Sequence, residues 1–280
     1  MQNSLGPSRS SAFVWTVIAA ALALAWNYPP LLTLITSLKS EAEILASPFA
    51  LPSAPTLEPY FAAWDALSYG TLFWNSLLYA AAGSALAVAL AIVPAVAFTW
   101  YPIPGRALLF VILLTTIMLP QQAVIIPLFT LLRILHLLDT RLGLIIVHAA
   151  YGMPFLLLIL TGFVGSIPRE LESAARIDGC SDFAIVRYVV LPLAGPAIAV
   201  GFTLNFIEVW KEYFFALVLL SSGDILPVNV GILAVTSDLY FTSMNVPSAA
   251  VILAQLPIII LFVFAYRWIT QGLYVGSVKG

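Results

Sequence analysis

Residues 74–99 of the chain read WNSLLYAAAGSALAVALAIVPAVAFT, a run of 26 residues without a charged side chain. The hydrocarbon core of a bilayer is about 30 Å thick and needs roughly 20 apolar helical residues to cross it. The run meets both requirements, so it predicts a membrane-spanning helix.

The composition of the whole chain agrees with a membrane location. Hydrophobic residues make up 62% of the 280 residues, charged residues make up 9%, and the mean hydropathy is +1.04. Soluble proteins carry about 25% charged residues, and so few charges could not cover a soluble surface. These values exclude a soluble secreted protein, a nucleic-acid-binding protein and a disordered chain.

Further apolar runs predict an all-α membrane protein with six transmembrane helices, in a single domain over residues 1–280. The six predicted spans are residues 12–37, 74–99, 107–132, 143–165, 188–221 and 249–271. Prolines inside several spans predict kinks, which membranes tolerate where neighbouring helices or cavity water satisfy the freed carbonyls. The single cysteine, Cys180, excludes an internal disulfide and a cysteine-based metal site.

The distribution of lysine and arginine predicts the orientation of these spans. Basic residues gather on the side that holds both termini, and this side is therefore cytoplasmic. The cytoplasmic residues are Arg9, Arg106, Arg169, Arg176, Arg187, Arg267 and Lys279, against Lys39, Arg133 and Arg141 outside. The topology is then N-in and C-in.

Two outer segments are long enough to hold structure of their own. Residues 38–72 contain four prolines that favour an extended course, and we expect a short interfacial helix near residues 60–67. The outer loop 222–248 is polar enough to cap the mouth of a cavity.

The cytoplasmic loop 166–187 reads SIPRELESAARIDGCSDFAIVR and predicts a short helix. Ser166 is a candidate cap and Pro168 suits a first helical turn. Gly179 allows a left-handed residue where the helix ends. Ser181 is a candidate cap for a second helix running toward Leu191–Pro192.

This helix can either rest on lipid headgroups or dock against another protein. An interfacial anchor usually carries large apolar residues and a polar face rich in lysine and arginine. The faces here are small and acidic, with Glu170 and Glu172 in the first turn. The pattern therefore favours a docking helix.

The residues from Glu172 to Gly179, followed by Leu191-Pro192-Leu193 and Pro196, resemble the EAA loop of permease subunits from bacterial ABC importers. The resemblance covers essentially the whole chain. Its flanks are similar to the carbohydrate-uptake branch, which includes the smaller permeases of maltose-type and glycerol-phosphate-type systems. These flanks are Ser37-Leu38-Lys39, Trp210-Lys211-Glu212-Tyr213-Phe214 and Gln271–Gly280.

The resemblance implies a type I importer permease fold in a bacterial cytoplasmic (inner) membrane. It implies a second permease subunit (a different chain), two ATPase subunits and an extracytoplasmic substrate-binding protein. The substrate would be a sugar, an oligosaccharide, a polyol or glycerol phosphate. ATP and Mg would bind in the partner ATPase, and this chain would bind no cofactor and no metal. The chain contains no Gly-rich phosphate loop, so it is predicted to be a transport subunit and not an enzyme.

The resemblance also assigns the loop as a lever that fits a cleft in the ATPase, bracketed by Pro168 and a corner at Leu191–Pro192. The implied coupling residues are Glu170, Leu171, Glu172, Ser173, Ala174, Ala175, Arg176, Asp178 and Gly179. Two positions depart from the family pattern. Ser173 stands where the first letter of EAA requires Glu, and Lys211 stands where the branch often has a neutral polar residue.

Three charged residues lie within the fifth span. Glu208, Lys211 and Glu212 are spaced by three and four residues, which places them on one helical face, and Asn205 extends that face. Charges at such depth are costly and mark functional candidates. They predict either a polar lining for the translocation path or an ion pair that holds a partner permease, and the two alternatives stay open.

Other polar residues of the spans are weaker candidates for the same cavity. They are Gln121, Gln122 and Asn75, for which hydrogen bonds between helices are the alternative. His136 and His148 have no second metal ligand at a suitable spacing, so we interpret them as interfacial or packing residues.

Two other classes of function are alternatives to the importer. An ion-coupled secondary transporter calls for internal repeats and an ion site near the midplane; no repeat is visible, although Glu208 and Glu212 keep this alternative open. An intramembrane enzyme is the weakest hypothesis, because no Gly-x-Ser-x-Gly, paired catalytic aspartates or His-Glu-x-x-His motif occurs.

Overall fold

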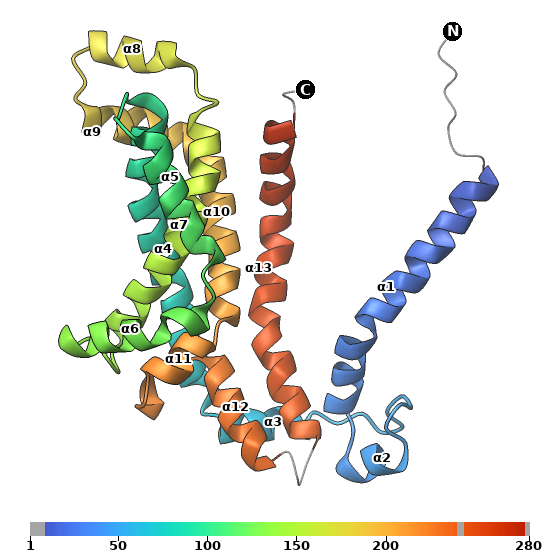
Figure 1. Ribbon diagram of the computed structural model, residues 1–280. Helices are drawn as coiled ribbons and strands as arrows, with labels where there is room; N and C mark the ends of the chain where they lie inside the picture. The colour runs from blue at the N-terminus through green and yellow to red at the C-terminus, as the bar shows by residue number, and fades with distance from the viewer. Residues whose placement is uncertain (1–8, 240–243, 278–280) are drawn as a thin grey trace. The chain divides into compact units, whose positions relative to one another are not determined.

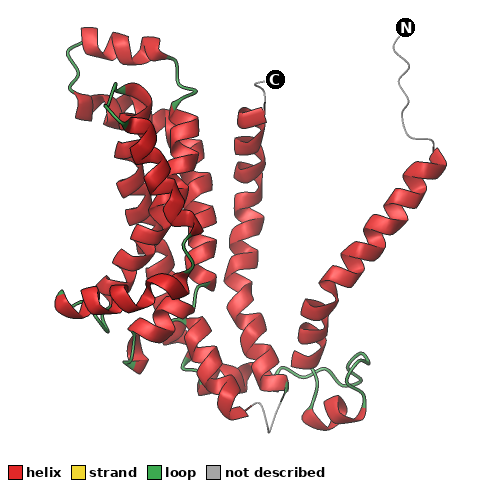
Figure 2. Ribbon diagram, in the orientation of Figure 1, coloured by secondary structure: helices red, strands yellow, loops and turns green. Residues whose placement is uncertain are grey.

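The computed structural model describes residues 9–239 and 244–277, with side chains described over 13–233 and 244–263. Every regular element in this part of the chain is helical (Figure 2). The side chains of Arg9, Arg267 and Lys279, which the orientation argument uses, lie outside the described side chains. The internal contacts divide the chain into two compact units, Met1–Ala66 with Ala234–Leu253 and Leu67–Leu233 with Ala254–Gly280.

The first unit holds the N-terminal helix and the outer segment. Its helices are α1 (Arg9–Ser37), α2 (Glu41–Ala46) and α3 (Glu58–Ala66), with the last part of α12 (Val228–Leu239) and the first part of α13 (Asn245–Ser277). α3 lies where the sequence predicts a short helix. α2 was not expected, and Ser40 caps it by accepting a hydrogen bond from the Glu43 N–H.

A buried lysine organises the outer segment of the first unit. Lys39 is fully buried, and its Nζ donates to the Ser47 carbonyl at 2.8 Å. The Lys39 carbonyl in turn accepts from Asn245 Nδ2 at 3.0 Å, and the hydroxyls of Ser37 and Tyr60 lie 2.7 Å apart. Burying a charge is tolerable only where hydrogen bonds replace its hydration. The buried Lys39 ammonium therefore requires the following segment to fold back so that the Ser47 carbonyl reaches it.

The second unit is built around two long helices, α4 (Tyr69–Trp100) and α7 (Arg141–Val164), with α10 (Leu191–Lys211) packed on both (Figure 1). α4 presents a small-residue face whose Ala80, Ala87 and Ala91 are fully buried. A Cβ added at Gly83 would lie 3.0 Å from His148 Cβ of α7. Small residues allow such close approach of helices in lipid, where packing replaces the hydrophobic effect as the main attraction.

The predicted span 107–132, in which prolines predict a kink, is sharply bent. α5 (Arg106–Thr115) and a 3₁₀ turn η1 (Thr116–Met118) are followed by α6 (Gln121–Ile134), with a bend of 103° between the two parts. Pro120 has no N–H and holds the residue before it out of the helical region; Leu119 accordingly has φ −74° and ψ 120°. The described residues thus contain five helices able to span a membrane by length and composition, or six with the bent pair as one.

The fifth span also differs from its prediction at both ends. α9 (Asp182–Ile185), a π turn η2 (Val186–Val190) and α10 form one stretch from Asp182 to Lys211, so there is no corner at Leu191–Pro192. A proline ring in a regular helix clashes with the carbonyl four residues earlier, and a π turn before Pro192 widens the helix there. The helix then ends at Lys211, and α11 (Phe214–Leu219) follows a two-residue break.

The outer loop predicted at 222–248 is partly helical. It contains a 3₁₀ turn η3 (Gly223–Ile225) and α12, and its residues 240–243 lie outside the described part of the chain. α4 holds this turn through polar side chains: Asn75 Nδ2 donates to the carbonyls of Asp224 at 2.8 Å and Leu226 at 3.0 Å. The Tyr79 hydroxyl donates to the Ile225 carbonyl at 2.7 Å.

Replacing Asn75 by alanine leaves the Leu226 carbonyl without its side-chain donor and the Asp224 carbonyl with Arg141 Nη2 at 3.2 Å. We expect the purified Asn75→Ala protein to lose about 1–3 kcal/mol of stability, measured as a lower midpoint of thermal unfolding. Gln122→Ala is the matched control, because Gln122 is exposed and its amide does not bond to the turn at residues 223–225. Equal midpoints for the two variants would contradict the anchoring role.

Candidate functional site

The loop 166–187 folds around the helix α8 (Arg169–Ile177). Gly179 ends it with φ +83°, and the N–H of Cys180 donates back to the Ala175 carbonyl at 2.9 Å. Ser181 caps α9 through the Ala184 N–H, as predicted. Ser166 does not cap α8: its hydroxyl donates to the Phe163 carbonyl at 2.7 Å instead, because Pro168 directly precedes the helix.

Glu172 lies between two arginines of the same helix. Its carboxylate accepts from Arg169 Nη1 at 2.7 Å and from Arg176 Nε at 3.0 Å, and its side chain is only 12% exposed. The partners stand three residues before and four residues after it, which are the spacings at which helical side chains meet. The charge of Glu172 is therefore paired within the chain. Ser173 is exposed, and its hydroxyl donates to the Arg169 carbonyl.

Arg169 fastens α8 to the end of α4. Its guanidinium donates to the carbonyls of Thr99 at 2.8 Å and Trp100 at 3.0 Å, and it lies 5.6 Å from the centre of the Trp100 ring. The last carbonyls of a helix have no partner within the helix and carry its negative dipole end. A cation at this point therefore satisfies both the hydrogen-bonding and the electrostatic demand.

Arg176 fastens the other end of α8 to α9. Its Nη2 lies 2.9 Å from Asp182 Oδ1 and donates to the Tyr101 hydroxyl at 2.9 Å, and that hydroxyl donates to Asp182 at 2.7 Å. The hydrogen bond to Glu172 raises the pKa of Arg176, while burial and then the bond to Asp182 raise the pKa of Tyr101. These charged hydrogen bonds tie α8 to α4 and to the long helix that begins at Asp182.

Most side chains of α8 that do not bind α4 or α9 are exposed. Ala175 is its buried residue, whereas Ile177 is 86% exposed and Leu171 43% exposed. The other predicted coupling residues Glu170, Ala174, Asp178 and Gly179 are also exposed. Figure 1 shows α8 across one end of the second unit, next to α9. The surface thus carries small and acidic residues, with two large apolar side chains, Leu171 and Ile177.

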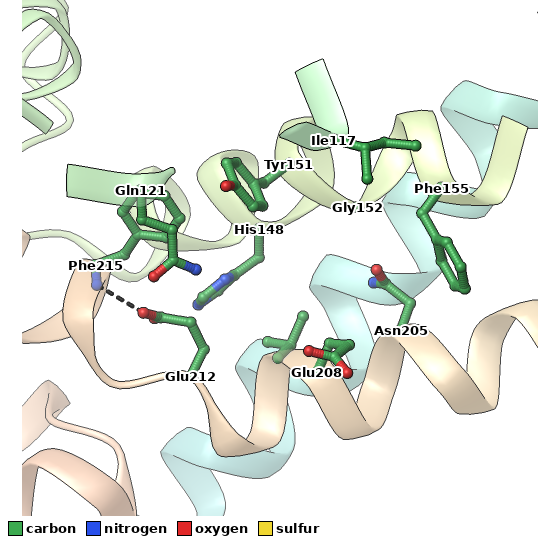
Figure 3. Close-up of a pocket in the computed structure, with 11 residues that line it drawn as sticks. Ile117, Gln121, His148, Tyr151, Gly152, Phe155, Asn205, Glu208, Glu212 and Phe215 are labelled. Atoms are coloured by element: carbon green, nitrogen blue, oxygen red, sulfur yellow. Dashed lines mark hydrogen bonds between the residues drawn. The ribbon is translucent and has the colours of Figure 1, made fainter. Parts of the chain in front are cut away.

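A separate pocket of about 330 Å³ opens between η1, α6, α7, α10 and the start of α11 (Figure 3). It is lined by Ile117, Gln121, His148, Tyr151, Gly152, Phe155, Asn205, Glu208, Val209, Glu212 and Phe215. All of these belong to the second unit.

Four of the predicted polar candidates meet in this pocket: Gln121, Asn205, Glu208 and Glu212. Asn205 is buried, and its Nδ2 donates to Ser84 Oγ of α4 at 2.9 Å. The carboxylate of Glu208 is 62% exposed and accepts from Lys211 Nζ at 2.7 Å.

The other three candidates lie elsewhere. Asn75 holds the turn at η3, which is the hydrogen-bonding alternative and not a place in the cavity. Gln122 is exposed and outside the pocket lining, although it follows Gln121 directly. Lys211 pairs with Glu208 from beyond the lining residues.

Glu212 reaches the pocket by a route the sequence did not predict. The residue is extended, at φ −68° and ψ 135°, so it does not continue the helical face of Glu208. Its Oε1 accepts from the Phe215 N–H at 2.8 Å and so supports the start of α11. Its Oε2 is buried and, among the described side chains, is one of two such oxygens without a hydrogen-bond partner.

His148, Tyr151, Phe155 and Phe215 complete the pocket and were missed. The sequence predicts His148 to be an interfacial or packing residue; it does contact the Phe215 ring, with centroids 6.4 Å apart, but it also lines the pocket. Its spacing to Tyr151, Gly152 and Phe155 is three, four and seven residues, which is one helical face. That periodicity was the available signal. No group of three or more metal-ligating residues occurs in the part of the chain that the structure describes.

Comparisons with known proteins match the chain to one family. A family model described as "Binding-protein-dependent transport system inner membrane component" matches residues 87–274. The sulfoquinovosyl glycerol transport system permease protein SmoH of Agrobacterium fabrum is 32% identical over 94% of this chain and 93% of its own. The diacetylchitobiose uptake system permease protein NgcG of Streptomyces coelicolor is 30% identical over 95% of this chain and 89% of its own.

A solved structure gives the same answer for the fold. A chain of a bacterial ABC transporter involved in the import of the acidic polysaccharide alginate superposes with a TM-score of 0.81 at 26% identity. The match covers 94% of this chain and 98% of the solved one. The predicted fold class, an importer permease built of helices, is therefore confirmed.

An alanine at residue 152 tests how tightly the pocket is packed. Its Cβ would overlap Asn205 Oδ1 and lie 2.8 Å from Asn205 Cγ, so Asn205 would have to give up its bond to Ser84. We expect Gly152→Ala to lose about 1–3 kcal/mol of unfolding free energy. Gly162→Ala on the same helix has open space around the added Cβ and should be neutral or stabilising by up to about 1 kcal/mol. Denaturation of both purified variants measures this, and equal stability would contradict the packing.

Proposed function

The chain belongs to the family of binding-protein-dependent transport system inner membrane components, and on that premise we propose that its α8 loop is the lever that couples it to a separate ATPase. The chain is a multi-pass permease subunit of a carbohydrate ABC importer in the bacterial inner membrane. The relatives are transport permeases, which supports this function and not the ion-coupled alternative.

The substrate class follows from the relatives as a group. Their names refer to sulfoquinovosyl glycerol, diacetylchitobiose and arabinooligosaccharides. For this chain we propose a carbohydrate substrate that an extracytoplasmic binding protein delivers, with a second permease completing the path. ATP and Mg would bind in two partner ATPase subunits.

The observation that carries the lever is the pair of arginine attachments. A rigid lever must transmit a push at its surface to the helices that move, so its ends must be fastened. Arg169 bonds to the Thr99 and Trp100 carbonyls at the end of α4, and Arg176 pairs with Asp182 at the start of α9. Charge-assisted hydrogen bonds are shorter and about twice as strong as neutral ones. A displacement of α8 would thus be transmitted both to α4 and to the long helix that begins at Asp182.

We further propose the N-in and C-in orientation, which places α8 on the cytoplasmic side. The described basic residues Arg106, Arg169, Arg176 and Arg187 support it, because all four stand at the α8 end of the second unit's helices. The residues Glu170–Gly179 would then face a cleft of the ATPase.

Ile177 is the side chain of α8 that best tests ATPase docking. With 86% of it exposed, Ile177→Asp should leave folding and membrane insertion intact. Burying its carboxylate in an interface would weaken ATPase binding by about tenfold or more, measured by co-purification of the ATPase with the tagged chain. Leu45→Asp is the matched control, since Leu45 is 77% exposed in α2. Undiminished co-purification with Ile177→Asp would refute docking through this face.

The transport reaction itself is tested on the complete complex. In proteoliposomes containing this chain, its partner permease and the ATPase, supplied with the loaded binding protein, we expect carbohydrate uptake that needs ATP and that vanadate inhibits. Gly179→Asp places a side chain where φ is +83°, at the end of the lever, and should reduce substrate-stimulated ATPase activity without reducing the amount of inserted protein. Uptake driven by an ion gradient in the chain alone would overturn the importer.

A further inference from the structure

The pocket of the second unit has an acidic lining. Glu208 and Glu212 contribute carboxylates, and none of its lining residues is a lysine or an arginine. Lys211 compensates Glu208 at 2.7 Å, which leaves the charge of Glu212 without a cation. The Oε2 of Glu212 is shielded from solvent and has no hydrogen-bond partner, so no donor offsets the negative charge of this oxygen beside the pocket.

The remaining lining has the chemistry that sugars require. Gln121 and Asn205 add amide groups, and the rings of Phe155 and Phe215 add flat apolar surface (Figure 3). Ligand pockets usually measure about 300–1,000 Å³ and combine apolar walls with a few placed polar groups; this one measures about 330 Å³. Sugar hydroxyls are donors to carboxylates, and the C–H faces of a sugar ring pack on aromatic rings.

We propose that this pocket is a subsite of the translocation path that accepts neutral sugar rings and rejects acidic ones. The inference rests on the proposed function and goes beyond it, since it names the charge class of the substrate and the residues that select it. The physical basis is that a carboxylated sugar would bring a second negative charge beside Glu212, and like charges in contact disfavour a complex strongly. Gln121 and Glu208 supply hydrogen bonds to the hydroxyls, Glu212 supplies the repelling charge, and Phe155 with Phe215 contacts the ring.

A helix of the partner permease is the other candidate occupant of the pocket mouth, at the ion pair of Glu208 and Lys211. Both side chains are more than half exposed, so a helix of the partner permease could cover them and close the pocket. A sugar probe would then fail to reach the lining residues in the assembled complex, and the subsite would be refuted.

A photoreactive sugar pair distinguishes these cases. The complete transporter in lipid nanodiscs is exposed to a diazirine-bearing glucoside or to the matching glucuronide, which differs by one carboxylate, and labelled peptides are mapped by mass spectrometry. We expect the glucoside to label peptides within 117–121, 148–155 or 205–215. The glucuronide should label them at least about tenfold less, because a like-charge contact disfavours its complex.

Charge-removing variants identify the selecting groups. Glu208→Gln combined with Glu212→Gln should bring the labelling of the two probes close to equality, and Glu58→Gln, which removes an exposed charge of α3, should leave their ratio unchanged. Equal labelling of the wild type by both probes, or labelling confined to other peptides, would overturn the subsite. Uptake measured after the same purified transporter is reconstituted into sealed proteoliposomes separates this outcome from failure of the proposed function: importing transporters without pocket labelling refute only the subsite.

Discussion

The close approach of α4 and α7 is the contact on which the second unit depends. Helices in lipid attract each other through packing and hydrogen bonds, so small residues at their interface matter more than large apolar ones. Gly83 of α4 admits His148 of α7, and Ser84 of the next position receives the amide of Asn205 from α10. A larger residue at 83 would push α4 and α7 apart and disturb the surface on which α10 packs.

α4 also connects features that stand far apart along the chain. Near its start, Asn75 and Tyr79 hold the 3₁₀ turn at residues 223–225. At its end, the free carbonyls of Thr99 and Trp100 receive Arg169 of α8. Between these points it supports the helices that line the pocket. One helix therefore holds the turn at residues 223–225, one of the helices that line the pocket and the α8 loop, each through hydrogen bonds to side chains.

Sequence reasoning worked best where the determinant is local. The length of α8 and its end at Gly179 follow from a turn that needs a positive φ, and a glycine provides it. It predicted kinks at prolines but not the size of each one. Pro120 breaks the third span by 103°, whereas Pro192 is accommodated by a π turn and breaks nothing. The residue type is the same, and the neighbouring helices decide which outcome occurs.

The sequence by itself determined that the chain crosses a bilayer with helices, because the transfer free energy of an apolar run is a sum over its own residues. It also determined the short loop helix and the resemblance to an importer permease. Only the tertiary structure decided which polar residues share a pocket. Gln121 and Gln122 are adjacent, yet the bend before α6 places one in the pocket and one outside it. Glu212 lies there because a break after Lys211 turns its carboxylate to the Phe215 N–H. Such positions depend on where three helices meet, which no single segment encodes.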